Sequence, residues 1–181
     1  MFSQQTNSPT PWVSWVLAIA GFWLSSNLVL DFLIMPVMYV SGMGTQADFA
    51  SAGYSLFWSF NRVELLCAAV ILTGVLALRH RLGEFEVSHS GSRCRWTLLL
   101  AVSLLSLALI DTYVLVPQMS AMAFALESAT PSAMTPVMTG LHSAYWLLEA
   151  LKLASLGGLA TLCFKALQAI AAPSASPDVL A

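Results

Sequence analysis

Four long runs of apolar residues dominate the pattern of hydrophobic and polar positions along the chain. They cover residues 12–40, 55–78, 96–122 and 140–168, and more polar stretches separate them. Each run is longer than the ~20 helical residues that cross a hydrocarbon core about 30 Å thick. Because lipid offers the backbone no hydrogen-bond partner, such spans form helices. The pattern therefore predicts an all-α polytopic membrane protein, with a four-helix bundle over residues 12–168.

The positions beyond these runs predict how the chain is organised. Residues 1–11 form a short amino-terminal segment without the basic start of a cleavable signal, so the first run is expected to be retained as a span. Residues 169–181 are rich in proline and serine, and a disordered tail is expected there. Pro36 and Pro117 are expected to kink or end the first and third spans.

The basic residues predict the orientation of the spans. The connection between the second and third spans carries four arginines, which are Arg79, Arg81, Arg93 and Arg95. The connections around 41–54 and 123–139 carry neither lysine nor arginine. By the positive-inside rule the middle connection is cytoplasmic, and both termini then lie on the same side. We expect a multi-pass protein of a bacterial inner membrane with cytoplasmic amino and carboxyl termini.

Composition agrees with a membrane protein and narrows the classes of function. Of the 181 residues, 58% are hydrophobic and 9% are charged, against about 25% charged residues in a soluble domain. The lipid bilayer is thus the expected partner, and the net charge of −2 argues against nucleic acid. The three cysteines lack the close spacing of a disulfide or zinc framework. No nucleophile–base pair, phosphate loop or dinucleotide motif indicates an enzyme.

Six charged residues interrupt the apolar spans at one depth, in the outer half of the predicted bilayer. They are Asp31, Arg62, Glu64, Asp111, Glu149 and Lys152. Each costs roughly 2.5–3.5 kcal/mol at the bilayer centre, so they are expected to turn inward and satisfy one another. With Asn61 and His142, they predict an acid-rich polar pocket that opens to the non-cytoplasmic face.

Helical spacing predicts which of these charges pair. Glu149 and Lys152 are three residues apart and can pair on one helix face, whereas Arg62 and Glu64 are two apart and cannot. Arg62 is therefore expected to meet Asp31 or Asp111 on another helix.

The charges in this pocket do not balance. The four acids face two bases, which leaves an excess of two negative charges if every group ionises. Burial disfavours the ionised form, so one or two acids can stay protonated; alternatively, the pocket holds a cation or a proton in transit. Two interpretations stay open. One is a proton, ion or ligand pathway, and the other is a structural cluster that fixes helix register in a subunit of a membrane complex.

Methionine is concentrated at the same side of the predicted bilayer. Met35, Met38 and Met119 lie near the outer ends of spans, and His142 opens the fourth span. Thioether sulfur and imidazole are ligands for Cu(I) and similar soft metals, which makes a soft metal ion the one cofactor to consider. The alternative is that the methionines fill irregular gaps between helices.

Two further patterns concern how the helices associate. The stretch LDFLIMPVM in the first span is similar to IDTYVLVPQM in the third, and Glu64 matches Glu149, which predicts two repeated helical hairpins. Ala150, Ala154 and Gly158 form a line of small residues that permits close helix approach. That line serves either packing within the bundle or contact with a second copy or another membrane protein.

Four segments carry a resemblance to a known family. They are DFLIMPVMYVSGM, FWSFNRVELL, DTYVLVPQM and LHSAYWLLEALKLASLGG. Together they resemble the uncharacterised four-span membrane domain shared with transmembrane protein 205, which is related to the membrane part of copper-resistance D proteins. The matching motif positions are Pro36, Asn61 with Glu64, Tyr113 with Pro117, and His142 with Ser143. The resemblance covers about residues 12–168 and implies a compact four-helix membrane domain with a link to soft metals.

The soft-metal interpretation predicts stoichiometric binding of Cu(I) or Ag(I) to the purified protein in detergent. Binding should be lost when Met35, Met38, Met119 and His142 are substituted together, because the variant removes every proposed ligand. If the well-folded wild-type protein binds neither ion, the methionines serve packing alone.

Overall fold

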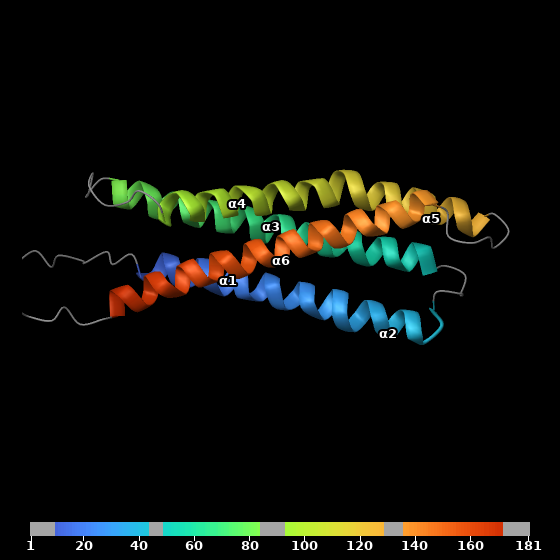
Figure 1. The fold of residues 1–181 in the computed structure, drawn as a ribbon, viewed down its shortest axis with the longest axis horizontal. Helices are drawn as coiled ribbons and strands as arrows, with labels where there is room; N and C mark the ends of the chain where they lie inside the picture. The colour runs from blue at the N-terminus through green and yellow to red at the C-terminus, as the bar shows by residue number, and fades with distance from the viewer. Residues whose placement is uncertain (1–9, 44–48, 84–92, 129–135, 172–181) are drawn as a thin grey trace, which may run out of the picture.

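The chain folds into four long antiparallel helices, as the apolar runs predict (Figure 1). The computed structural model describes residues 10–43, 49–83, 93–128 and 136–171. The elements are α1 (Thr10–Val29), η1 (Leu30–Ile34), α2 (Met35–Val40), α3 (Phe49–Gly83), α4 (Arg93–Ile110), η3 (Asp111–Leu115), α5 (Val116–Ser128) and α6 (Pro136–Ala171). The all-α four-helix bundle is thereby confirmed.

Four stretches of these helices are long and apolar enough to cross a membrane. They are Trp12–Val40, Ser51–His80, Arg95–Ala125 and Pro136–Ala169. Each contains the core of one predicted span, so the multi-pass membrane architecture is confirmed. The segments 1–9 and 172–181, with most of the predicted tail, lie outside the described residues.

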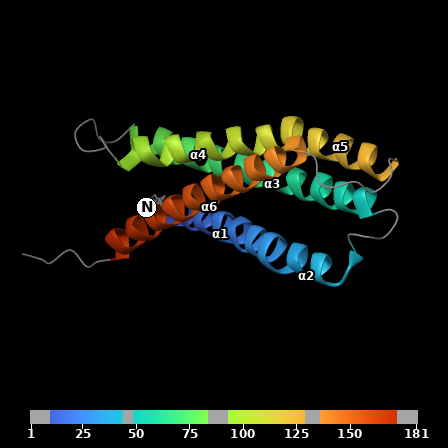
Figure 2. The same cartoon turned by 45° about the vertical axis from the view of Figure 1, so that its right-hand side comes forward.

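The helices form a ring in which each packs against two neighbours (Figures 1 and 2). Helix α1 lies beside α3 and α6, and α4 also lies beside α3 and α6. Among the described residues, α1 and α4 are therefore one diagonal pair, and α3 and α6 are the other. We call the end where α1 begins and α6 ends the terminal end. The far end is the one where α2 ends and α3 begins.

The first and third spans share an unusual turn just before their prolines. The segments η1 and η3 are single turns of π-helix, and each ends two residues before Pro36 or Pro117. A proline has no N–H and crowds the preceding turn, and a π-helical turn widens the backbone there. The helices then continue as α2 and α5, so of the two predicted effects of the prolines, a kink or a helix end, the structure excludes the second. The shared position agrees with the repeat of two hairpins.

Backbone hydrogen bonds define these two turns. The N–H of Met35 donates to the carbonyl of Leu30, and the N–H of Val116 donates to the carbonyl of Asp111. Both bonds span five residues instead of four. Asp31 and Asp111 thus lie within the only two π-helical turns of the described chain.

The apolar core fills the part of the bundle nearer the terminal end. Its side chains are almost completely buried, whereas large apolar residues such as Trp15 and Leu66, each 67% exposed, cover the outside. An apolar exterior is what a protein solvated by lipid requires, because water is not the solvent there. Cys67 and Cys163 are buried and unpaired, as their position in apolar runs predicts.

Helices α1 and α3 approach so closely that one glycine is required between them. A Cβ atom added at Gly74 would lie 2.7 Å from Cγ2 of Val16, which is buried. Gly21 and Gly157 are different, because an added Cβ at either would have no neighbour within 4 Å.

We expect Gly74→Ala to destabilise the protein by about 1–3 kcal/mol, the usual effect of forcing an extra methyl group into a packed core. The measurement is unfolding of the purified protein in mixed detergent micelles. Gly21→Ala and Gly157→Ala are matched controls, and both should leave stability unchanged or slightly raised. Equal stability of Gly74→Ala and the controls would contradict the close approach of α1 and α3.

Candidate functional site

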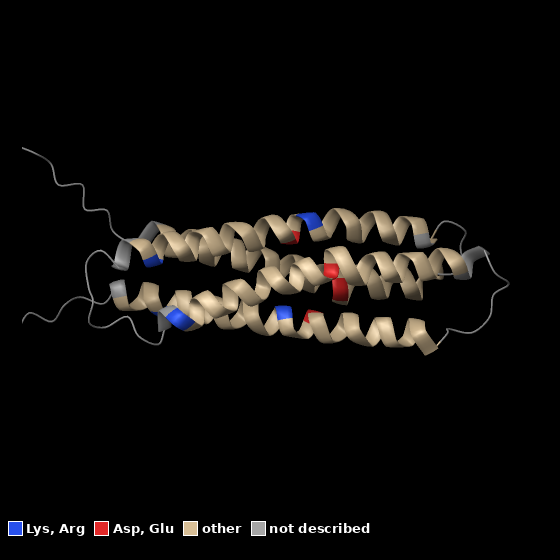
Figure 3. Cartoon of the chain, turned by 90° about the horizontal axis from the view of Figure 1, so that it is seen from above, with Lys and Arg blue, Asp and Glu red and all other residues tan. Residues whose placement is uncertain are grey.

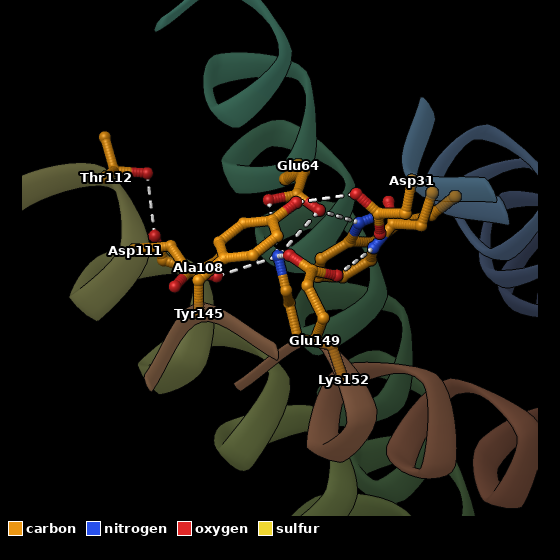
Figure 4. Close-up of polar contacts among 10 residues, drawn as sticks. Asp31, Glu64, Ala108, Asp111, Thr112, Tyr145, Glu149 and Lys152 are labelled. Atoms are coloured by element: carbon orange, nitrogen blue, oxygen red, sulfur yellow. Dashed lines mark hydrogen bonds and ion pairs between the residues drawn. The ribbon is translucent and has the colours of Figure 1, made fainter. Parts of the chain in front are cut away.

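A single buried lysine stands at the centre of the intramembrane charges (Figure 4). The ammonium of Lys152, on α6, is 3.0 Å from Oε2 of Glu64 and 2.8 Å from Oδ2 of Asp111. It is also 2.5 Å from Oε1 of Glu149, one helical turn away, which confirms the predicted pairing of Glu149 with Lys152. The lysine is only 1% exposed, so these charges interact with little screening by water. We call Lys152 and the four buried acids, Asp31, Glu64, Asp111 and Glu149, the carboxylate cluster.

Two side chains of α1 connect that helix to the cluster. The indole N–H of Trp23 donates to Oε1 of Glu64 at 2.8 Å. The amide of Asn27 donates to Oε2 of Glu149 at 3.2 Å. Together with the contacts of Lys152, these bonds connect side chains from all four spans.

The fourth acid, Asp31, joins the cluster from its far-end side. The hydroxyl of Tyr145 donates to Oδ1 of Asp31 at 2.6 Å, and Asp31 is only 3% exposed. The carboxyl groups of Asp31 and Glu149 also lie within hydrogen-bonding reach of each other. Two carboxyl groups can share a hydrogen bond only if one of them carries a proton.

Four buried polar atoms near the cluster have no hydrogen-bond partner among the described protein atoms. They are Oδ1 of Asn27, Nδ2 of Asn61 and both carboxyl oxygens of Asp111, of which Oδ2 forms the ion pair with Lys152 and Oδ1 has no partner. A buried carboxylate oxygen without a donor is costly, and the cost is smaller for a neutral carboxyl group. The surroundings of Asp111 therefore favour a proton on Oδ1, the carboxyl oxygen that does not contact Lys152.

The structure corrects the predicted role of Arg62. It is exposed on the outside of α3, and its guanidinium lies 4.1 Å from the centre of the Trp58 ring. Two residues along a helix correspond to a rotation of about 200°, so an inward Glu64 turns Arg62 outward. A long arginine side chain on the outside can extend toward a headgroup region and lie over an aromatic ring. The prediction that Arg62 pairs with Asp31 or Asp111 is wrong, and Lys152 takes that place.

The remaining predicted polar residues lie at the cluster or beyond it. Asn61 is buried one turn before Glu64 on the same face of α3. His142 is half-buried, and its Nδ1 is 3.0 Å from the carbonyl of Met138 on its own helix.

The predicted soft-metal ligands are not brought together by the described contacts. Met35 and Met38 lie on α2, which contacts η1 and, among the described residues, neither α5 nor α6. Met119 lies on α5 and His142 on α6. The described residues also contain no group of three or more His, Cys, Asp or Glu side chains arranged to hold a metal ion.

Three residues of the site had no assigned role in the sequence-based prediction. Trp23 and Asn27 precede Asp31 by eight and four residues, and Tyr145 precedes Glu149 by four. Residues four apart share a helix face, so the spacing already puts Asn27 on the face of Asp31 and Tyr145 on the face of Glu149, whereas Trp23 was not predicted.

The corrected set of residues makes the charge imbalance larger. Four acids (Asp31, Glu64, Asp111 and Glu149) now share one buried base, which leaves an excess of three negative charges if all ionise. Figure 3 shows the acidic segments gathered around the middle of the bundle, deep within the apolar spans. Such an excess cannot be sustained in a medium of low dielectric constant, so some of these carboxyl groups bind protons.

The line of small residues on α6 divides between two faces. Gly158 faces the bundle, since an added Cβ there would lie 3.5 Å from Leu100. Ala150 and Ala154 are exposed on the outside. Only Gly158 therefore serves close packing within the bundle.

Replacing Lys152 by methionine should destabilise the protein by about 3–5 kcal/mol, because it leaves buried carboxylates without their cation. The loss should be smaller at acidic pH, where protonation neutralises the acids. Unfolding in mixed detergent micelles at neutral and acidic pH measures both effects. Arg62→Met is the matched control and should have little effect, since Arg62 is exposed. Equal stability of the two variants would overturn the central position of Lys152.

The site has to be interpreted from its own residues. Neither family models, nor curated proteins, nor solved structures provide a match for this chain. The relation to the four-span domain of transmembrane protein 205 therefore stays a prediction from the sequence.

Proposed function

We propose that the protein binds protons at the carboxylate cluster and moves them within the membrane, as a small proton-translocating or proton-coupled membrane protein. The observation that carries this proposal is the burial of four acids around one lysine, with every one of these five side chains at most 5% exposed. A cluster of this kind holds exchangeable protons because its charge can be lowered only by protonation or by a bound cation.

The arrangement favours protons over a metal cation. Lys152 places a tethered positive charge where a metal ion would have to sit, in contact with three carboxylates. The centre of the cluster is thereby occupied by an ammonium, and a second cation beside it would meet strong repulsion. A proton avoids this repulsion because it binds covalently to a carboxyl oxygen and removes a negative charge there.

Intramembrane acids are commonly part of proton relays, and this cluster has the connectivity that a relay needs. Polar contacts lead from Tyr145 to Asp31, from Asp31 to Glu149 and from Glu149 to Lys152. The lysine in turn contacts Glu64 and Asp111. If the termini are cytoplasmic, as the arginines predict, the far end faces the outside of the cell.

One observation favours a second function, that of a structural subunit. The bonds of the cluster link side chains of all four spans, which is also what a purely architectural cluster would do. The two functions differ in what they require of Asp111, whose Oδ1 makes no hydrogen bond to the described protein atoms.

We expect Asp111→Asn to fold normally and to lower proton movement at least tenfold. Asparagine keeps a carbonyl oxygen as acceptor for Lys152 but cannot take up a proton. The measurement is proton flux into proteoliposomes that contain a pH-sensitive dye, together with unfolding in detergent. Thr112→Val is the matched control on the same turn, since among the described residues its hydroxyl bonds to the carbonyl of Ala108 at 2.7 Å and to no member of the cluster. An unfolded Asp111→Asn, or a wild-type protein without flux, would favour the structural function.

Infrared spectroscopy tests the binding of protons without requiring transport. The wild-type protein at neutral pH should show carbonyl-stretch absorption from protonated carboxyl groups, and Asp111→Asn should weaken it. A wild-type spectrum with ionised carboxylates only would contradict the proposal.

A further inference from the structure

We propose that, in the conformation described here, the carboxylate cluster exchanges protons with one side of the membrane only, the side of the far end, and that Tyr145 with Asp31 forms the access. This inference rests on the proposed function and adds the direction from which the site is loaded. It is carried by the contrast between the two sides of the cluster.

Toward the terminal end, the cluster rests on a layer of completely buried apolar side chains. These residues are Ala20, Ala68, Ile71, Leu104, Ala108, Leu156 and Leu159, and each is at most 1% exposed. They come from all four spans and belong to one continuous core. On α6 the layer extends over a full turn below Lys152, from Leu156 to Leu159. A chain of water molecules needs polar partners, and these side chains provide none. In this conformation protons therefore have no path through this layer, and their release toward the terminal end requires a second conformation.

Toward the far end, fewer side chains are buried: beyond Asn61 on α3, Leu115 on η3 and Val116 on α5, the described side chains of these helices are partly or fully exposed. On α6, no described side chain from position 136 to position 148 is completely buried, and the same holds for α3 from position 51 to position 60. On α2 none of the six residues is buried. Water and headgroups can therefore approach the cluster from this side more closely than from the other.

Tyr145 and Asp31 stand where the more exposed region meets the cluster. The ring of Tyr145 packs edge-on against the rings of Phe57 on α3 and of Trp146. The distances between ring centres are 5.8 Å and 5.9 Å. Its hydroxyl turns inward and donates to Asp31 (Figure 4). The phenol is thus the polar group of this aromatic layer that contacts the acids.

This arrangement defines a proton relay whose charges balance at each step. The Tyr145 hydroxyl gives its proton to Oδ1 of Asp31 and receives another proton from the far-end side, so the phenol is unchanged. Asp31 then shares the proton with Glu149, with which it lies within hydrogen-bonding reach. Tyr145 is thus a member of the relay that both holds Asp31 and passes protons to it.

The test uses sealed membrane vesicles of both orientations, right-side-out and inverted, with the lumenal and external pH set separately. Dicyclohexylcarbodiimide crosses membranes and reacts with protonated carboxyl groups in apolar surroundings. Its attachment to the peptides that contain Asp31 or Glu149 is measured by mass spectrometry. Protease digestion of a carboxyl-terminal tag identifies the side on which the terminal end lies.

We expect the labelling rate of the wild-type protein to follow the pH on the far-end side much more closely than the pH on the terminal side. Tyr145→Phe should slow the response to far-end pH at least tenfold, because it removes the hydroxyl and keeps the ring packing. Tyr113→Phe is the matched control, since Tyr113 is 65% exposed on η3. Ile71→Ser should place a hydroxyl in the apolar layer and make labelling respond to terminal-side pH as well.

Two results would overturn the inference while leaving the proposed function intact. One is labelling that follows the terminal-side pH or both sides equally, and the other is an unchanged response in Tyr145→Phe. The complete absence of labelling and of protonated carboxyl absorption would instead contradict proton binding itself. The two failures are therefore distinguishable.

Discussion

The contact of one ammonium group with three carboxyl groups is the interaction on which the rest of the structure depends. Lys152 brings Glu64 of α3, Asp111 of η3 and Glu149 of α6 to the centre of the bundle, and the bonds of Trp23 and Asn27 add α1. In lipid, apolar surfaces gain little by packing against each other, so buried polar contacts and close packing determine which helices associate and at what depth. The same contact also creates the surplus of acid that makes the cluster a proton-binding site. Architecture and chemistry thus arise from the same side chains, and a substitution such as Asp111→Asn has to separate them.

The fold could be predicted from the sequence because the constraints of a bilayer are strong and simple. The lengths of the apolar runs predicted four helices, and the structure places all four near the predicted positions. The common level of the acids along the bundle and the pairing of Glu149 with Lys152 also followed from spacing alone. The π-helical turns were less accessible, since Pro36 and Pro117 indicate a disturbed helix without specifying how the backbone absorbs it.

The composition of the site was harder to predict than its existence. Arg62 was assigned to the pocket because a charge within a span is expected to turn inward, yet a residue on the lipid side can extend along the helix and rest on Trp58. Once Glu64 faces inward, helical geometry alone places Arg62 outside, and Lys152 becomes the partner of Asp111. The sequence does not show that Trp23, Asn27 and Tyr145 bond to the acids, because that requires knowing which acids are buried beside them. Side-chain contacts between helices depend on rotation and register, which a single sequence constrains only weakly.

The two hairpins match at two places. The first and third spans each contain a π-helical turn, and α3 and α6 each carry a buried glutamate, Glu64 or Glu149. The residue three positions after each glutamate breaks this correspondence: it is Lys152 in the second hairpin and Cys67, also buried, in the first. With lysine at both places, two cations would face the four acids; with cysteine at both, no cation would. The surplus of acid thus depends on the difference between the two halves at this position. A symmetric pair of identical hairpins could not reproduce it, because any such pair would carry an even number of lysines at its centre.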